Sequence, residues 1–371
     1  MTTVGMTSKP FGKAIGLLVL CLCALAVPVR AQPAAAALQA LLDDFVSEQR
    51  LPGAVLGVTG PPLDAVVATG MLDRKTGARV TPQSRFYIAS AGKIMTATAT
   101  LQLIDEGRVR LDQPIAEILV PAGSLARLPN WGSVTVEQLL NHTSGMPDYF
   151  DDEYQQAAVK DARMLVDVER ALSLQLDEKA NAKPGAKHDY SNTNYALLGL
   201  MLERVDGADL GTVLARRIFV RSGMTATTVG ADPRQPSVAS GHGSKRTPSA
   251  RDNLIAYGSK LGDGPATTTA GDMGRFLAAL LREKKLLKPA TLQRMLAPSR
   301  REAGYGLGIE ISGTDFGPCY GHSGSVTGFK AEAWYYAARR TSIVFLTNGE
   351  FGTDATDVVA RAAQIVFKSA R

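Results

Sequence analysis

FYIASAGKIMTATATLQLIDEG, residues 86–107, places a serine between a short apolar run and an amphipathic helix. Residues 86–89 predict a strand, and Gly107 is a typical stop signal after a helix over residues 90–106. The apolar face of that helix repeats at Ile94, Ala97, Leu101 and Ile104. We therefore expect Ser90 to lie where a strand passes into a helix.

Outward from this segment, strands are predicted near both ends of the chain. Residues 54–59 and 64–69 are β-rich runs separated by Gly60-Pro61-Pro62, which predicts a hairpin. Three further strands are predicted at residues 305–311, 329–336 and 341–347.

Helices are predicted at residues 34–49, in a closing segment with Val358, Ala362 and Val366 on one face, and through most of residues 107–300. We expect an α/β (α+β) fold whose antiparallel sheet is built from the N- and C-terminal segments and is flanked by the terminal helices. A large, mostly helical insertion interrupts that sheet. One domain over residues 32–371 would hold a sheet region at about 34–106 and 301–371 and a helical region at about 107–300.

Residues 1–31 are typical of a secretory signal peptide. Lys9 and Lys13 precede an apolar run over residues 14–28, and small residues lead to a cleavage point after Ala31. The apolar run is too short to span a bilayer. We expect a periplasmic or secreted protein without a stable membrane span.

The composition of the remaining chain disfavours several classes of protein. Without residues 1–31 the chain keeps 38 basic and 35 acidic residues, a balance unlike that of a nucleic-acid-binding surface. Cys319 is then the only cysteine, so no intramolecular disulfide is expected. The chain has no zinc-type histidine spacing and no phosphate-binding glycine loop, so we predict neither a metal nor a cofactor.

Lys93 follows Ser90 by three residues, which is about one helical turn, so its amine can approach the hydroxyl. A serine hydroxyl is a weak nucleophile until a base takes its proton, and a lysine in a partly desolvated cleft can be that base. Backbone N–H groups at the start of a helix favour the oxyanion that forms when a carbonyl is attacked. The structural alternative is that Ser90 is an N-cap and Lys93 a surface charge.

Tyr190-Ser191-Asn192 follows the loop Lys183-Pro184-Gly185 and precedes a predicted helix. A tyrosine in this turn can relay a proton between nucleophile and leaving group, and an asparagine can hold a substrate amide. The structural alternative is that Ser191 or Asn192 caps the helix and Tyr190 packs beneath it.

His322-Ser323-Gly324 lies at the end of a probable strand, where small residues allow a substrate backbone to lie alongside. The stretch resembles the G-x-S-x-G nucleophile elbow except for Ser325 in place of the last glycine. An elbow needs a strand, a turn and then a helix, whereas residues 329–336 alternate like another strand. Ser323 is therefore not expected to be the nucleophile.

These three motifs, in this order and at this separation, resemble the signatures of the serine β-lactamase and penicillin-binding protein superfamily. The resemblance is to the branch with class C β-lactamases, D-Ala-D-Ala carboxypeptidases and β-lactamase-like esterases, and it extends over about residues 38–368. Three further segments also resemble this branch, at residues 139–149, 190–203 and 267–276.

The resemblance implies that Ser90 forms an acyl-enzyme, that Lys93 and Tyr190 share the proton transfers, and that Asn192 positions the substrate. It also implies an oxyanion hole made by the backbone N–H groups of Ser90 and Ser325. The third wall of the cleft would then be formed by His322, Ser323 and Gly324.

His322 departs from the K-T-G motif of class C β-lactamases, because a histidine is mostly neutral at pH 7 and supplies no fixed positive charge. Ser323 keeps the hydroxyl of the usual threonine. We expect a serine hydrolase of the esterase or carboxypeptidase type, acting on small-molecule or peptide-like substrates such as peptidoglycan fragments or β-lactams. The alternative is a penicillin-recognising or peptidoglycan-binding protein with little turnover, or a weak class C-like β-lactamase.

Other residues near these motifs are interpreted structurally. His142 is expected to be a structural histidine hydrogen-bonded under a turn, and Cys319 a small buried apolar residue without an assigned role. Tyr149 and Phe150 are candidates to line the cleft, with no preference over a packing role.

Overall fold

A computed structural model describes the chain at residues 1–3, 31–232, 234–243, 258–264, 266–349 and 356–368. The apolar run of the predicted signal peptide lies outside these described residues. Within them, no helix has both the length and the apolar character needed to cross a membrane.

Seven antiparallel strands form the main sheet, in the order β3-β2-β1-β10-β9-β8-β7. The two ends of the chain meet at its centre, where β1 (Gly53–Gly60) pairs with β10 (Thr341–Thr347) and Leu56 lies opposite Phe345. The expected fold class is thereby confirmed. The other strands are β2 (Leu63–Asp73), β3 (Ala78–Arg79), β7 (Glu310–Thr314), β8 (Gly317–Val326) and β9 (Phe329–Tyr336).

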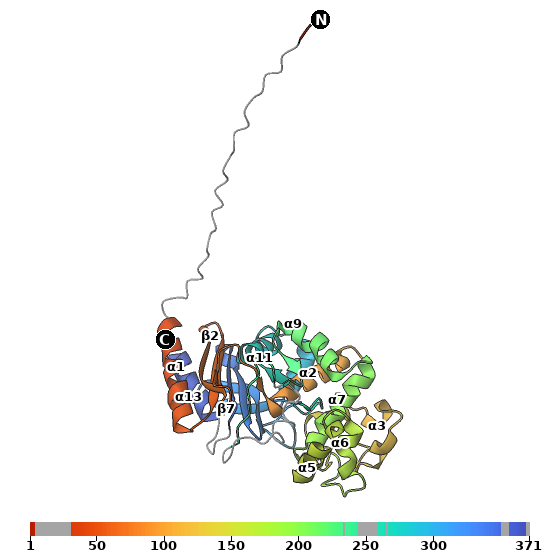
Figure 1. The fold of residues 1–371 in the computed structure, drawn as a ribbon. Helices are drawn as coiled ribbons and strands as arrows, with labels where there is room; N and C mark the ends of the chain where they lie inside the picture. The colour runs from red at the N-terminus through yellow and green to blue at the C-terminus, as the bar shows by residue number, and fades with distance from the viewer. Residues whose placement is uncertain (4–30, 233, 244–257, 265, 350–355, 369–371) are drawn as a thin grey trace.

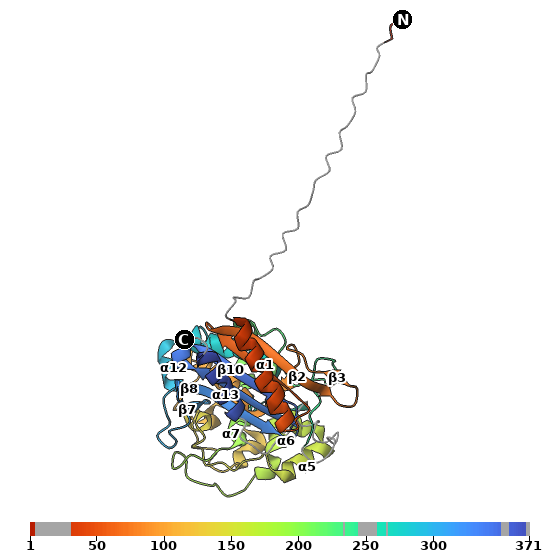
Figure 2. The same cartoon turned by 90° about the vertical axis from the view of Figure 1, so that its left-hand side faces the viewer.

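The terminal helices α1 (Ala31–Glu48) and α13 (Thr356–Lys368) cover one face of this sheet and lie side by side (Figures 1 and 2). The apolar face of α1 packs there, and the ring of Phe45 meets that of Phe345 edge-on at 5.6 Å. Because strand side chains alternate between faces, Leu56 points to these helices while its neighbour Val55 joins the core on the opposite side. Burying both faces gives the sheet two hydrophobic cores.

The opposite face carries α11 (Ala270–Leu277) and the helical part of the chain. Helix α2 (Lys93–Asp105) packs mainly against α7 (Asn192–Asp206) and also contacts strand β8 of the main sheet. Its residues from Lys93 to Leu103 are all buried, because neighbours surround it on every side.

Short helical turns and a second sheet complete the helical part. The turns are η1 (Ala89–Gly92), α3 (Ile115–Ile118), η2 (Gly123–Arg127), α4 (Val136–Leu140), α5 (Asp152–Lys160), η3 (Ala162–Leu165), α6 (Val168–Ala171), η4 (Leu172–Gln175), α8 (Leu210–Leu214), η5 (Ala215–Phe219), α9 (Val220–Ser222), η6 (Ala278–Arg282) and α12 (Pro289–Met295). The small sheet has the order β4-β6-β5, from β4 (Phe86–Tyr87), β6 (Ala266–Thr268) and β5 (Thr228–Val229).

The strand expected over residues 305–311 is wrong in its position. Residues 305–309 form a turn and β7 runs over Glu310–Thr314, because Gly308 adopts a left-handed φ of +75° that ends an extended run. Strand β8 was expected only as a probable strand that ends at residues 322–324, and it runs over Gly317–Val326. Its glycines and its proline lower the strand propensity that a sequence pattern can show, but pairing with β7 and β9 on both sides overrides them.

Asp206, at the end of α7, accepts from three arginines and is 2 % exposed. Its carboxylate lies 2.5 Å from Arg217 Nε, 2.6 Å from Arg108 Nη1 and 3.0 Å from Arg216 Nη2. We expect Asp206→Asn to lower the free energy of unfolding by about 2–4 kcal/mol in a urea titration, since the buried guanidinium of Arg217 loses one of its two anionic partners and keeps Glu106.

The hydrogen bond from Arg217, with help from Arg108 and Arg216, holds the pKa of Asp206 well below its usual range. A carboxyl with a lowered folded-state pKa adds stability above its unfolded pKa, and loses it as the pH falls toward the folded value. The difference in the free energy of unfolding between wild type and Asp206→Asn should therefore become smaller below about pH 4. Asp112→Asn, in an exposed pair with Arg110, is the control and should change stability by less than about 0.5 kcal/mol. A difference that does not vary with pH would contradict this account.

Candidate active site

Ser90 lies in the η1 turn, between β4 and α2, where the main sheet and the helical part meet. It was expected at the N-terminus of a helix over 90–106, but that helix begins at Lys93 and Ser90 is in a 3₁₀ turn before it. Ala89 just before it has a φ of +46°, an unusual backbone for a residue with a side chain. Such strain is typical of functional sites, where packing on all sides holds the backbone in place.

Lys93 is fully buried and its ammonium donates to three oxygens. Nζ lies 3.0 Å from Ser90 Oγ, 2.6 Å from Asn192 Oδ1 and 2.6 Å from the backbone oxygen of Asp263. These acceptors use all the hydrogens of the ammonium and offset the cost of burying it. The surface-charge interpretation of Lys93 is therefore excluded.

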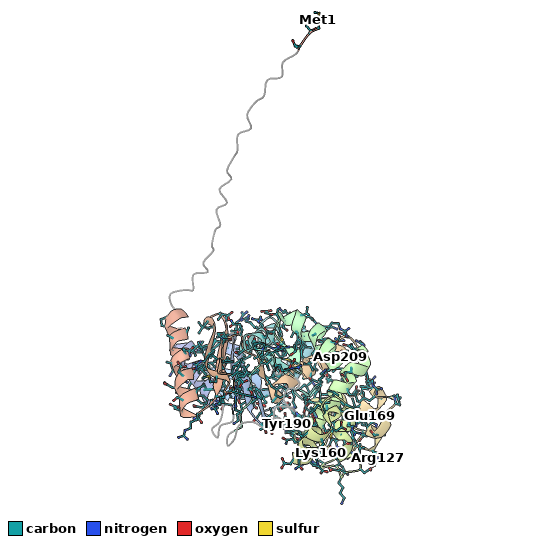
Figure 3. The ribbon with its side chains drawn as sticks, viewed as in Figure 1. Met1, Arg127, Lys160, Glu169, Tyr190 and Asp209 are labelled. Carbon is teal, nitrogen blue, oxygen red and sulfur yellow. The ribbon has the colours of Figure 1, made fainter. Side chains whose placement is uncertain are left out.

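Tyr190 stands over this lysine, at the boundary between the two parts of the molecule (Figure 3). Lys93 Nζ is 5.1 Å from the centre of its ring, and 38 % of the tyrosine is exposed. The ring also stacks on His142 at 4.2 Å between centres. Tyr190 is therefore packed against both residues and is still partly exposed.

His142 is completely buried beneath Tyr190. Its Nδ1 accepts from the backbone N–H of Ser191 at 3.2 Å, and Asn194 Nδ2 lies 3.1 Å from the same atom. Burial, and then the nearby charge of Lys93, lowers the pKa of His142 well below its usual value, so the ring is neutral. These contacts agree with the structural role expected for this histidine.

Asn192 is the first residue of α7, and its side chain points back to Lys93. Asp148 fixes it there, because its carboxylate accepts from Asn192 Nδ2 at 3.0 Å and from the Asn192 backbone N–H at 2.9 Å. Ser191 precedes the helix but makes no side-chain cap. The capping interpretation of Ser191 is therefore not what the structure shows.

Strand β8 brings the third motif against the turn that holds Ser90. A Cβ on Gly324 would lie 2.1 Å from the backbone oxygen of Ile88 and 2.9 Å from the N of Ala91, so only glycine permits this approach. Ser325 follows it on the exposed side. Ser325 and Ser90 therefore border the same pocket.

His322 is buried, and its Nδ1 lies 2.5 Å from the backbone oxygen of Ser323 and 3.1 Å from Glu310 Oε1. Since both neighbours are acceptors, Nδ1 carries a hydrogen and Nε2 accepts from the Tyr305 hydroxyl at 3.0 Å. Burial lowers the pKa of His322 more than Glu310 raises it. The imidazole is therefore neutral near pH 7 and provides no fixed positive charge.

Ser323 points to Glu310, with its Oγ 3.1 Å from Oε1. The chain after it stays in β8 until Val326 and then turns into β9, so no helix follows. The strand-turn-helix context of a nucleophile elbow is absent at this serine.

A small pocket of about 50 Å³ opens beside Ser90. Phe150 lines it, whereas its neighbour Tyr149 is buried beneath and donates to Asp263. Its described lining residues are Tyr87, Ala89, Ser90, Phe150, Asn192, Asp263, Ser325 and Val326.

Sequence reasoning missed three carboxylates around this site, at Asp148, Asp263 and Glu310. Asp148 lies in the segment GMPDY and Asp263 in the segment LGDG. Sequence spacing connects none of the three carboxylates to the motifs. Among the described residues, no three His, Cys, Asp or Glu side chains are grouped so that they could hold a metal ion. A larger cavity of about 600 Å³ lies elsewhere, near Gln138, Arg294 and Arg301, and contains none of the predicted site residues.

Comparison with known proteins supports the assignment that the motifs suggested. The family model described as Beta-lactamase matches residues 38–367. The chain belongs to the beta-lactamase family. Its members share the serine β-lactamase and penicillin-binding protein fold, which places this chain among serine hydrolases of that fold.

Relatives of this beta-lactamase family member include both penicillin-binding proteins and an amidohydrolase. "Penicillin-binding protein 4" of Amycolatopsis lactamdurans is 32 % identical over 186 residues, which cover 50 % of this chain and 47 % of that protein. The match thus spans about half of the relative's length.

Two solved structures resemble the chain over most of its length. A D-stereospecific amidohydrolase from Streptomyces sp. is 27 % identical with a TM-score of 0.72, covering 88 % of this chain and 97 % of the other. A penicillin-binding protein from Bacillus halodurans is 29 % identical with a TM-score of 0.73, covering 86 % and 97 %. Both likenesses are consistent with the sheet and helical parts described above.

Proposed function

We propose that this protein is an exported serine hydrolase that forms an acyl-enzyme at Ser90 and cleaves an ester or a peptide-like amide. The observation that supports this most strongly is the 3.0 Å contact between Lys93 Nζ and Ser90 Oγ inside a buried site. A nucleophile within hydrogen-bond reach of a base is the arrangement that acyl transfer needs.

In this mechanism Lys93 first gives up one of its three protons to solvent, and the neutral amine then accepts the hydroxyl proton, directly or through Tyr190, as Ser90 Oγ attacks the carbonyl carbon. The backbone N–H groups of Ser90 and Ser325 stabilise the tetrahedral oxyanion, and Asn192 positions the substrate. The proton then passes to the leaving group, and water activated by Tyr190 and Lys93 releases the acyl group. His322, Ser323 and Gly324 form the wall along which the substrate lies.

The type of substrate is inferred from the missing positive charge at His322 in the third wall of the cleft. A neutral His322 gives a drug carboxylate no cation, which disfavours efficient β-lactam hydrolysis. The likeness to a D-stereospecific amidohydrolase supports amide cleavage, and esterase and D,D-carboxypeptidase activities use the same acyl-enzyme. A penicillin-recognising protein with little turnover is the second candidate, because the relatives include penicillin-binding proteins.

Export is proposed from the apolar run at residues 14–28 and the small residues that end at Ala31. A hydrolase of cell-wall-like or amino-acid-derived amides would meet such substrates outside the cytoplasm. The position of the amino terminus of the protein recovered from a native extract would show directly whether residues 1–31 are removed.

Trapping the acyl group tests the proposed nucleophile. We expect purified residues 32–371, mixed with a short-chain p-nitrophenyl ester and quenched early, to show a burst of nitrophenolate close to one per enzyme. Mass spectrometry of the digested protein should then place the acyl group on the peptide that contains Ser90. An acyl group on the Ser323 peptide instead would contradict the proposal, and a label on Ser90 that never turns over would favour the penicillin-recognising alternative.

A further inference from the structure

The pocket beside Ser90 contains a carboxylate surrounded by aromatic rings. Asp263 is 9 % exposed, and its Oδ2 accepts from the Tyr149 hydroxyl at 2.8 Å. Tyr87 and Phe150 line the pocket with it. Tyr154 completes the aromatic cluster, with its ring centre 4.6 Å from that of Tyr149 and 5.6 Å from that of Phe150.

We propose that this pocket binds a protonated amine of the substrate, with Asp263 as its counter-ion. The substrates would be amides or esters whose acyl part carries a free amino group next to the carbonyl, such as an amino-acid amide or the N-terminal residue of a peptide. The inference deepens the proposed function and rests on Ser90 as the nucleophile.

The chemistry of the pocket suits a cation. A carboxylate forms short, charge-assisted hydrogen bonds with an ammonium, and aromatic rings attract a cation through their electron-rich faces. Burial is the main cause that raises the pKa of Asp263; the charge of Lys93 lowers it, and Asp148, next to the pocket, raises it by a smaller amount. An added cation beside Asp263 would therefore stabilise the ionised form of this carboxylate.

Among the described residues, no positively charged side chain forms an ion pair with the carboxylate of Asp263. Burial raises its pKa, so the ionised form is costly until a cation lies beside it. Lys93 donates to the backbone oxygen of Asp263 and not to its carboxylate.

The position of the pocket also fits an amine close to the reacting carbon. In an amino acid the amine nitrogen is about 2.5 Å from the carbonyl carbon, two bonds away. Ser90 Oγ and the Asp263 backbone oxygen both contact the same lysine nitrogen, so nucleophile and pocket are adjacent. A volume of about 50 Å³ is enough for an ammonium group.

Binding measurements on a protein that cannot turn over test this inference apart from the chemistry. Ser90→Ala is titrated calorimetrically with D- and L-alaninamide and with propionamide, which has the same carbon skeleton and no amine. The pH is 6.5, where an α-amino group with a pKa of about 8 is protonated. We expect the preferred alaninamide enantiomer to bind about 10- to 100-fold more tightly than propionamide, the usual range for a hydrogen bond to a charged group.

Adding Asp263→Asn to Ser90→Ala should bring that affinity ratio down to within about threefold of one, because the amide keeps the shape and loses the charge. Asp151→Asn is the matched control: Asp151 caps α5 nearby but does not line the pocket, so the ratio should stay above tenfold. Thermal melting of each variant shows whether it is folded.

Equal affinities for alaninamide and propionamide, or a ratio that survives Asp263→Asn in a folded protein, would overturn the inference. Either result leaves the acyl-enzyme at Ser90 standing, because that is measured separately by the ester burst. Conversely, an acyl group that never forms on Ser90 would refute the proposed function even if the amine binds.

Discussion

Ser90→Ala should reduce ester or amide turnover by at least about 10⁴-fold while leaving the fold intact. The expected loss is this large because, among the described residues, Ser90 Oγ is the one hydroxyl that is hydrogen-bonded to Lys93 Nζ, at 3.0 Å. Removing the nucleophile leaves only binding and the oxyanion donors, which alone give slow reaction with water. Steady-state hydrolysis of a short-chain p-nitrophenyl ester measures the loss, and circular dichroism with thermal melting verifies the fold.

Ser323→Ala is the matched control, since it removes a second serine hydroxyl from the same cleft. That hydroxyl donates to Glu310 at 3.1 Å and contacts neither Lys93 nor Tyr190 in the structure. We expect turnover to fall by less than about tenfold, the scale of one hydrogen bond. If Ser323→Ala were inactive and Ser90→Ala active, the nucleophile would have to be reassigned.

Lys93→Met should lower turnover by about 10²- to 10⁴-fold, the usual range for a general base. The change also leaves Asn192 Oδ1 and the Asp263 backbone oxygen without their donor, which costs about 1–3 kcal/mol of unfolding free energy for each. Both the rate and the stability are therefore expected to fall. Single-turnover acylation kinetics on protein whose folding has been verified by melting separates the two effects.

Lys93→Arg distinguishes the proton-transfer role of the lysine from its charge. A guanidinium keeps the positive charge and hydrogen-bond donors but does not give up a proton at neutral pH. If the lysine acts as a base, Lys93→Arg should be nearly as slow as Lys93→Met. Activity within tenfold of wild type in Lys93→Arg would show that the charge alone matters, and would transfer the base role to Tyr190, which Tyr190→Phe then tests.

Much of the fold could be predicted because local patterns and the final packing agree. The hairpin of β1 and β2 has a Gly-Pro-Pro turn between two β-rich runs, and α1 has an apolar stripe that covers the sheet. The sequence left the bounds of β8 open and misplaced the strand near residue 305. Strand β8, rich in glycine, forms because it is paired on both sides, and residues 305–309 form a turn because Gly308 is left-handed.

The sequence by itself determined which reactive residue types exist and which pairs lie within one helical turn. Ser90 with Lys93 is such a pair, and the 3₁₀ turn that leads into α2 keeps the two side chains about one turn apart. The order of the three motifs also sufficed to indicate the family, which the match over residues 38–367 then showed.

Only the tertiary structure decided the environment of those residues. Asp263 and Lys93 are in contact although they are 170 residues apart in the sequence, and Asp148 and Asn192 are 44 residues apart. Local sequence spacing therefore could not predict either contact. The neutral state of His322 is likewise a result of packing. The pKa of a histidine in water lies close to neutral pH, and burial lowers the pKa of His322. The physical reason is that electrostatic and desolvation energies depend on distance and burial in space, and a chain reveals these only after it has folded.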